Sequence, residues 1–277
     1  MIKSSDLFDG KNVYITGGSS GIGLAMAEQA AAAGAHVLIF ARDEDRLRQA
    51  AEKIRAARRD EKQNVAWHAL DVTNVAVVLP TFWRNVEQFG PPDILINSAG
   101  QARPNYFEKI NAEQFDATMK LNLYGTRHAI AAALPHMKPG GYIVNVSSVA
   151  GLIGVFGYTD YSASKFAVIG FSEALRAELK PRGITVSVLC PPDTDTPGLE
   201  AENVTKPAET RAISANARTI PAETVALALM RGMAKKQFLI IPGFDARLSV
   251  LVKRLAPGLV EWIMNRTIAR IHQSSAK

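Results

Sequence analysis

The sequence predicts an α/β fold: a doubly wound parallel sheet of about seven strands with helices on both faces, followed by a helical C-terminal tail. Two observations support this prediction. Short apolar segments alternate with helical segments from residue 12 to residue 243, as in a parallel sheet with crossover helices. Segment 93–100 has a continuous apolar core, as expected of a strand covered on both faces.

The composition is that of a soluble globular protein, with 277 residues of which 47% are apolar and 21% charged. We expect one domain over residues 1–243 and a basic extension over residues 244–277. The one cysteine, Cys190, lies in a strand-like apolar run, which indicates inert packing in a reducing compartment. The histidines show no ligand-like spacing with one another or with Cys190, so no metal site is expected.

The first ten residues lack a signal-peptide pattern, and no run reaches the ~18 apolar residues of a membrane span, so a cytoplasmic protein is expected. The net charge of +6 includes a basic cluster between residues 53 and 62. No aromatic residues are interleaved with it in a recognised motif, which favours a solvated helix face over a nucleic-acid partner.

The first strand, NVYITG, runs directly into a glycine-rich turn and an alanine-rich helix. Glycines here allow a tight turn and close approach to a pyrophosphate, and the helix N-terminus supplies free N–H groups. The predicted dinucleotide-binding residues of this turn are Gly17, Ser19, Ser20, Gly21, Ile22 and Gly23.

The second strand, HVLIFAR, ends at Arg42, where proteins specific for NAD usually offer an acid to the ribose hydroxyls. Arg42, with Arg46 one helical turn later, can instead hold a 2′-phosphate through charge-assisted hydrogen bonds. The sequence therefore favours NADPH. The alternative is two solvated arginines beside Asp43 and Asp45.

Further cofactor contacts are expected where the next two strands end. Asp71, followed by Val72, is placed to accept a hydrogen bond from the adenine amino group, although an Asp before Thr73 can equally cap a helix. In DILINSAG the cofactor can pass close to the backbone of a small-residue segment. The residues expected there are Asn97, Ala99 and Gly100.

The chemistry is predicted around a strand that ends in two serines and a helix that carries Tyr161 and Lys165. Their i, i+4 spacing puts phenol and ammonium on one helical face, where the ammonium can stabilise the phenolate. A hydroxyl at the strand end, Ser148 or Ser147, can hydrogen-bond a substrate oxygen beside the phenol.

Asn122 lies within a helix expected over residues 111–137, where asparagine is mildly unfavourable. Two alternatives remain open for it. It binds a water that connects Lys165 to solvent, or it hydrogen-bonds a neighbouring helix.

The polar, proline-rich segment at about 192–220 follows the carboxyl end of a strand and is a candidate lid. At its base we expect Pro191, Thr194 and Thr196 to contact the nicotinamide end of the cofactor. The alternative is a proline-stiffened surface loop.

The tail carries two apolar stripes, each flanked by arginines such as Arg254 and Arg266. The first stripe is Leu248, Leu251, Val252 and Leu255, and the second is Val260, Ile263, Met264, Thr267 and Ile271. Residues 244–271 therefore fit peripheral contact with a membrane surface. They fit equally well a pair of helices packed on the body or on a second subunit.

Together these residues resemble the short-chain dehydrogenase/reductase family over about residues 8–243, through TGGSSGIG, NSAG, Asn122, Ser148 and YSASK. The resemblance implies a Rossmann-type sheet with Tyr161 as acid/base. It also implies that Lys165 lowers the pKa of Tyr161 and binds the nicotinamide ribose, that Ser148 orients the carbonyl, and that Asn122 holds a proton-relay water. A homodimer or homotetramer through the helices bearing Asn122 and Tyr161 is implied as well.

Within the family, the segments ARDEDRL, FGYTDYSASKFA and PPDTDTPG with ENVTKPAET are similar to those of reductases acting on long-chain sphingoid bases. This implies NADPH-dependent reduction of the C3 ketone of 3-ketosphinganine to sphinganine. Better-known eukaryotic members carry a hydrophobic N-terminal segment that is not seen here, so membrane contact is expected from the tail. The alternatives are another lipid ketone, such as a 3-oxoacyl thioester or a sterol, and a regulator that senses NADP without turnover.

Overall fold

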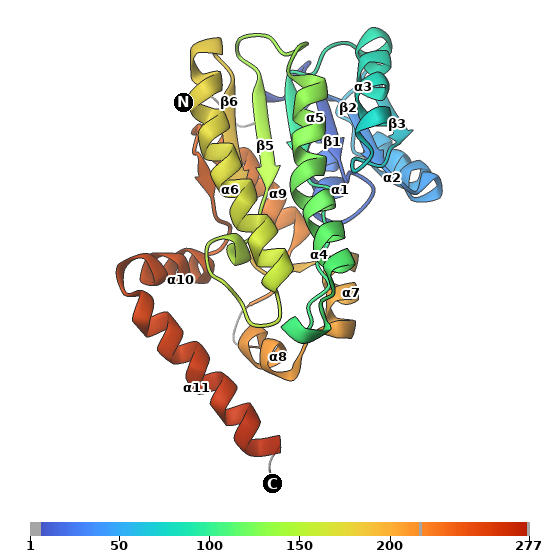
Figure 1. Cartoon of the computed structure of the whole chain (residues 1–277). Coiled ribbons are helices and arrows are strands. Elements are labelled where there is room, and N and C mark those ends of the chain that lie inside the picture. The colour runs from blue at the N-terminus through green and yellow to red at the C-terminus, as the bar shows by residue number, and fades with distance from the viewer. Residues whose placement is uncertain (1–6, 216–217, 276–277) are drawn as a thin grey trace.

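The computed structural model describes residues 7–215 and 218–275 and contains a seven-stranded sheet in the order β3-β2-β1-β4-β5-β6-β9 (Figure 1). Every neighbouring pair of strands in it is parallel. The strands are β1 Asn12–Thr16, β2 His36–Ala41, β3 Val65–Ala69, β4 Ile94–Asn97, β5 Tyr142–Val146, β6 Thr185–Leu189 and β9 Leu239–Ile240. The strand order reverses direction between β1 and β4, which opens a crevice at their carboxyl ends. The predicted doubly wound fold is confirmed.

Helices cover both faces of the sheet because successive side chains of each strand enter opposite cores. In β1, Val13 and Ile15 enter one apolar core, and Tyr14 between them enters the other. In Figure 1, α5 and α6 lie in front of the sheet, and α1 and α9 lie behind it. The helices behind are α1 Gly21–Ala32, α2 Glu44–Ala56 and α9 Ala222–Ala234. Those in front are α3 Val75–Phe89, α5 Gly125–Ala133 and α6 Thr159–Leu179, and α4 Ala112–Met119 packs against α6.

The helix predicted over residues 111–137 is interrupted. A π-helical turn, η3 (Lys120–Tyr124), separates α4 from α5 and contains Asn122. A π turn inserts an extra residue into the helix, and such turns often occur at functional sites. The remaining short helices are η2 Phe107–Lys109, η4 Val149–Gly151 and η5 Lys180–Arg182.

The predicted lid contains regular structure. A two-residue strand, β7 (Thr194–Asp195), pairs in parallel with β8 (Ile220–Pro221) at the two ends of this segment. Between them lie the helices α7 (Pro197–Thr205) and α8 (Ala208–Ser214). We use the name lid segment for residues 192–220, of which 216–217 lie outside the described residues.

The tail forms two helices, α10 (Phe244–Leu255) and α11 (Pro257–Ser275), and α11 packs against α8 and α10. His272 of α11 approaches Glu209 of α8, with 2.8 Å between Nε2 and Oε1. The residues of the second predicted stripe are half-buried, except Ile263, which is exposed. That stripe therefore mainly contacts the body. Residues 1–6 and 276–277 of the predicted domain and tail lie outside the described residues.

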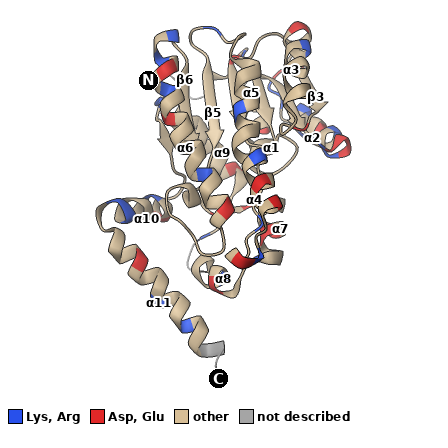
Figure 2. Ribbon diagram, in the orientation of Figure 1, with Lys and Arg blue, Asp and Glu red and all other residues tan. Residues whose placement is uncertain are grey.

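Basic and acidic residues are interspersed along α2, where the basic cluster begins (Figure 2). Arg55 pairs with Glu52, Arg59 pairs with Asp9, and Arg58 donates to the carbonyl oxygen of Gln63 at 3.2 Å. Within residues 7–215 and 218–275, no helix combines the length and the apolar character needed to cross a bilayer.

Candidate active site

A cavity of about 1590 Å³ opens at the carboxyl ends of the strands, where ligands bind in doubly wound sheets. Its walls come from the loops after β1, β2, β3, β4 and β5, from α6 and the lid segment, and from α10 and α11. Of the predicted site residues, all line this cavity except Gly23, Asn97 and Asn122. The structure therefore brings most of the predicted residues together in one place.

The glycine turn is shaped by close backbone approaches. Gly17 has a φ of +69°, and a Cβ on it would lie 2.7 Å from the backbone nitrogen of Ala99. A Cβ on Gly23 would lie 2.2 Å from the carbonyl oxygen of Gly17, so Gly23 serves the packing of α1 on the turn. Ser20, at the start of α1, makes no side-chain capping bond. The N–H groups of the first helical turn are therefore free to bind an anion, which fits the pyrophosphate of a dinucleotide.

At the end of β2, the exposed side chains of Arg42 and Arg46 line the cavity. Asp43 caps α2 by accepting a hydrogen bond from the Arg46 backbone N–H at 3.0 Å, and its carboxylate lies 3.5 Å from Arg46 Nε. Asp45 pairs with Arg48 at 2.9 Å instead. The neighbouring acids thus engage Arg46 and Arg48, and within the described chain Arg42 has no ion pair.

Asp71 organises the loop after β3. Its Oδ1 accepts hydrogen bonds from the Thr73 backbone N–H at 2.9 Å and from the Thr73 hydroxyl at 2.8 Å. The cap of α3 itself is Asn74, whose Oδ1 accepts from the N–H of Ala76. Asp71 therefore shapes a turn before the helix and also lines the cavity beside Val72.

Asn97 has a structural partner that the sequence did not reveal. Its side-chain amide donates to Asn145 Oδ1 at 2.9 Å, across the β4–β5 register that aligns these two residues. Asn97 is 1% exposed and points into the sheet. The cavity wall at this strand end is formed by Ala99 and Gly100 instead.

The two serines after β5 have different environments. The hydroxyl of Ser147 donates to the carbonyl oxygen of Lys165 at 2.8 Å and is buried. Ser148 Oγ accepts from the Ala150 backbone N–H at 3.1 Å, and its hydrogen bond with Tyr161 acts to lower the pKa of that phenol. Ser148 is therefore the serine that faces the phenol.

Tyr161 and Lys165 share one face of α6, with Lys165 Nζ 5.5 Å from the centre of the Tyr161 ring. The ammonium donates to the carbonyl oxygen of Val146 at 3.0 Å. Burial lowers the pKa of Lys165 to about 8, because the charged form loses its hydration.

The pKa of the Tyr161 phenol is raised in this structure. Loss of water around the phenol raises its pKa, and the carboxylate of Glu202 raises it further. The Ser148 hydrogen bond acts in the other direction. Burial is the largest of these effects, so the phenol is held in its protonated form.

Asn122 joins three segments. Its Oδ1 accepts from the Gln101 backbone N–H at 3.0 Å, and its amide donates to the Gln101 carbonyl at 3.0 Å and to Ser164 Oγ of α6 at 2.9 Å. The side chain thus makes the hydrogen bond to a neighbouring helix that was one of the two alternatives. A Cβ on Gly100 would lie 3.1 Å from Asn122 Oδ1 and 3.3 Å from Lys165 Nζ, so both groups flank Gly100.

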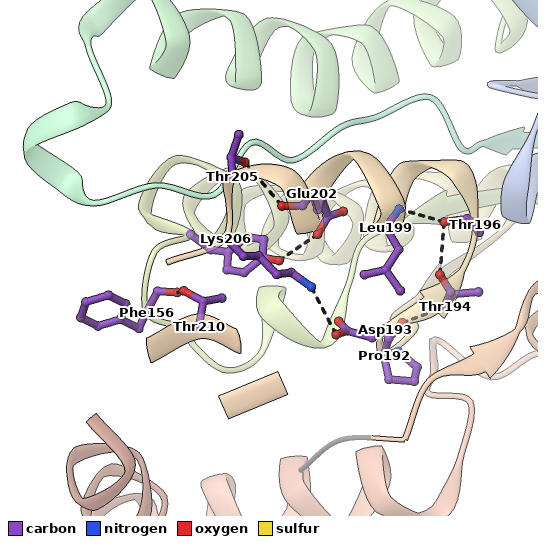
Figure 3. A network of polar contacts seen from close by, with 11 residues as sticks. Phe156, Pro192, Asp193, Thr194, Thr196, Leu199, Glu202, Thr205, Lys206 and Thr210 are labelled. Atoms are coloured by element: carbon purple, nitrogen blue, oxygen red, sulfur yellow. Dashed lines mark hydrogen bonds and ion pairs between the residues drawn. The ribbon is translucent and has the colours of Figure 1, made fainter. Parts of the chain in front are cut away.

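At the base of the lid segment, Thr194 donates its hydroxyl to the Pro192 carbonyl at 2.8 Å. Thr196 caps α7 by accepting from the Leu199 N–H at 3.2 Å and donates to the Thr194 carbonyl at 3.2 Å (Figure 3). The carbonyl of Pro191 accepts from the Val149 N–H at 3.0 Å. These residues line the cavity while fixing the path of the chain into the lid segment.

A family model for the short chain dehydrogenase matches residues 11–207. The chain belongs to this family. As a short chain dehydrogenase it is an oxidoreductase that uses a nicotinamide dinucleotide, in agreement with the glycine turn and the strand order.

The chain is similar to curated members of known name. It is 40% identical over 252 residues to the 3-ketodihydrosphingosine reductase of Bos taurus, covering 90% of this chain and 76% of that one. It is 39% identical over 253 residues to the 3-dehydrosphinganine reductase of Danio rerio, with the same coverage of 90% and 76%. A crystal structure of a short chain dehydrogenase/reductase from Burkholderia phymatum in complex with NAD superposes with a TM-score of 0.79. That pair is 27% identical over 91% of this chain and 95% of the other.

Sequence reasoning did not identify a second group of cavity residues. Tyr158 donates its hydroxyl to Glu202 Oε2 at 2.8 Å, and Lys206 Nζ lies 3.6 Å from Asp193 Oδ2. Figure 3 shows Asp193, Glu202 and Lys206 gathered in the polar network of the lid segment. The spacing of Glu202 and Lys206, i and i+4 across the end of α7, was the signal that they lie on one side of the helix.

Proposed function

We propose that this protein reduces the C3 ketone of 3-ketosphinganine to sphinganine with NADPH, as a step of sphingolipid synthesis. The observation that carries the proposal is the placement of Ser148, Tyr161 and Lys165 in one large cavity that the apolar tail helices also line. The names of its curated relatives support the same substrate, a small-molecule lipid ketone.

The reaction adds a hydride to the ketone carbon and a proton to the ketone oxygen. The hydride is the chemistry that NADPH supplies when it is bound. The Ser148 hydroxyl and the Tyr161 phenol donate hydrogen bonds to the ketone oxygen, which polarises the carbonyl. Because its pKa is raised, Tyr161 holds the proton that it then transfers to the developing alkoxide.

The proton must then be replaced on Tyr161. The Lys165 ammonium lies beside the phenol ring and offsets the negative charge left on it. Asn122 Oδ1 and Lys165 Nζ flank Gly100 at one point of the wall, which suits a water that passes protons from solvent. Lys165 also binds the nicotinamide ribose in this proposal.

The preference for NADPH rests on the end of β2. Arg42 has no ion pair within the described chain and lines the cavity, so its guanidinium is available for a 2′-phosphate. Arg46, which pairs with Asp43, supplies a second cation when its guanidinium also contacts the 2′-phosphate. Asp71 is proposed to accept from the adenine amino group, and Pro191, Thr194 and Thr196 to contact the nicotinamide end.

The long chain of the substrate is placed along the tail. Val260 and Met264 of α11 and Ile213 of α8 line the cavity with apolar surface. A sphingoid chain buried there gains hydrophobic free energy of about 0.8 kcal/mol per CH₂. In this proposal the domain over residues 1–243 and the extension over residues 244–277 therefore form one substrate site together.

The tail is proposed to contact the cytoplasmic face of a membrane while the protein remains cytoplasmic. Its exposed apolar side chains include Phe244, Leu248, Leu251, Leu255, Leu259, Trp262 and Ile263. Arg266 lies over the Trp262 ring at 5.2 Å, so its charge is held beside that surface.

Sedimentation with anionic vesicles tests this membrane contact. The Trp262→Ser variant should bind the vesicles at least about 5-fold more weakly than the wild type, and unchanged binding would contradict the proposal.

The protein is also proposed to form a homodimer or homotetramer through α4, α5 and α6. Phe115 of α4 and Phe166 of α6 are exposed on this side of the molecule. Exposed aromatic side chains of this size are frequent in subunit interfaces. Sedimentation velocity measures the state, and a monomer at micromolar concentration would contradict it.

The function is tested by NADPH oxidation in mixed micelles with 3-ketosphinganine, beside NADH and a short 3-oxoacyl thioester. We expect turnover of the sphingoid ketone with NADPH, and none with the Tyr161→Phe variant. Turnover of the thioester alone would show that the proposed substrate is wrong, while the proposed ketone-reduction chemistry would stand. Binding of NADPH without turnover of either ketone would favour a cofactor-sensing regulator.

A further inference from the structure

Glu202 has an unusual position for a carboxylate. It lies on α7 in the lid segment, is half-buried, and lines the same cavity as Ser148 and Tyr161. Its Oε2 accepts the 2.8 Å hydrogen bond from Tyr158, whose ring centre lies 5.5 Å from that of Tyr161. Figure 3 shows Glu202 within the polar network of the lid segment. One neutral side chain thus connects Glu202 to the proposed proton donor.

The charge of Glu202 is not matched by a salt bridge. The second carboxylate of this network, Asp193, pairs with Lys206 at 3.6 Å, and the Lys206 side chain is only 2% exposed. Among the residues that the structure describes, no cation lies within ion-pair distance of Glu202. The Glu202 carboxylate instead accepts a hydrogen bond from the hydroxyl of Tyr158.

The charge of Glu202 opposes the proposed proton transfer from Tyr161. Burial raises the pKa of Glu202 by more than the Tyr158 hydrogen bond and the charges of Lys206 and Lys165 lower it, so the charged form remains incompletely compensated. Its negative charge also raises the pKa of Tyr161 and so opposes formation of the phenolate after proton transfer. A cation bound between Glu202 and the ketone site would relieve both effects.

We infer that Glu202 determines specificity by binding the ammonium group at C2 of the sphingoid base. This inference rests on the proposed function. The ammonium is on the carbon next to the ketone, so a ketone held by Ser148 and Tyr161 brings the ammonium close to the lid segment. Glu202 then supplies a charge-assisted hydrogen bond that a ketone without the amine does not receive.

The test compares two substrates and two variants. The substrates are 3-ketosphinganine and 1-hydroxyoctadecan-3-one, which has the same chain, hydroxyl and ketone but no amine. The variants are Glu202→Gln, which keeps an acceptor for Tyr158, and Glu200→Gln, which removes an exposed charge outside the cavity on the same helix. Glu202→Gln should lower kcat/KM for 3-ketosphinganine by at least about 30-fold, mainly through KM.

The same variant should change kcat/KM for the amine-free ketone by less than about 3-fold, because no charge pair is lost there. Glu200→Gln should leave both substrates near the wild-type values. An equal loss for both ketones with Glu202→Gln would overturn the inference and leave the proposed function standing. Failure of the wild type to reduce 3-ketosphinganine would overturn both.

Folding is checked by thermal unfolding and by NADPH binding of each variant. If Glu202→Gln does not fold, Glu202→Asp takes its place, since it keeps the charge but withdraws it by one methylene. Its preference for the amine-bearing ketone should fall by about 3- to 10-fold relative to the wild type. An unchanged preference would overturn the inference.

Discussion

The two halves of the cavity are built by different means. The half around the glycine turn is shaped by backbone: tight glycine contacts, the first turn of α1 and the ends of β1 and β4. The other half is shaped by side chains of α6, α7, α8 and α11, which come from distant parts of the chain. The first half suits a ligand shared by a whole family, and the second suits a ligand that varies from member to member.

Tyr161 lies where the two halves meet, so its loss should separate binding from chemistry. Tyr161→Phe removes the proton donor and keeps the ring, and turnover should fall by at least about 10³-fold. NADPH affinity, measured by fluorescence titration, should change by less than about 3-fold because the phosphate contacts stay in place. Tyr124→Phe, on an exposed tyrosine outside the cavity, is the control. Surviving activity would mean that the proton comes from another group.

The adjacent serines provide the next comparison. Ser148→Ala removes a donor to the ketone oxygen and should lower kcat by about 10²-fold. Ser147→Ala should change kcat by less than about 3-fold, because its hydroxyl bonds to the Lys165 carbonyl, but should cost about 1 kcal/mol of stability. Steady-state kinetics and urea unfolding of both variants check this. The reverse result would exchange the roles of the two serines.

The buried ammonium of Lys165 makes stability depend on pH. Its pKa is lowered from the ordinary 10.5 to about 8, so between these values the unfolded chain holds a proton that the folded protein has released. Unfolding then requires proton uptake, and stability rises with pH across this window. Relative to Lys165→Met, the wild type should gain about 2 kcal/mol between pH 7 and pH 9.5. Urea unfolding at several pH values measures the difference, and parallel curves would show that burial does not lower the pKa of Lys165.

Arg42 tests the half built around the glycine turn. Arg42→Ala should raise KM for NADPH by about 10-fold, since one charge-assisted hydrogen bond to the 2′-phosphate is lost, and should leave NADH unaffected. Arg48→Ala is the control, because Arg48 lies nearby on α2, pairs with Asp45 and does not line the cavity. An equal loss for both cofactors would contradict the proposed preference.

The sequence could predict the features that depend on local spacing, but not those that depend on contacts between distant segments. The strands, the glycine turn and the pairing of Tyr161 with Lys165 follow from local periodicity and spacing, so they were visible along the chain. The partner of Asn97 was not, because Asn145 becomes its neighbour only through the β4–β5 register. The raised pKa of Tyr161 likewise comes first from burial of the phenol and then from the charge of Glu202, which approaches from the lid segment.

The tail is a second case in which contacts between distant segments decide the outcome. Its apolar stripes were predicted, but periodicity alone does not say which stripe meets the body and which meets solvent. The structure turns Val260 and Met264 of the second stripe toward the cavity and leaves Leu251 and Leu255 of the first stripe exposed. That choice is made by the contact of α11 with α8, a helix in the lid segment.

The smallest expected effect tests whether α11 completes the substrate half. Val260→Trp places a larger side chain in the cavity wall and should lower kcat/KM for the long-chain ketone by about 5-fold. A ketone shortened to a few carbons should be unaffected, because its chain ends before it reaches α11. Ala269→Trp, on an exposed position of the same helix outside the cavity, is the control. Equal effects on long and short ketones would mean that the alkyl chain of the substrate does not contact α11. The helix would then act only by packing against α8 of the lid segment.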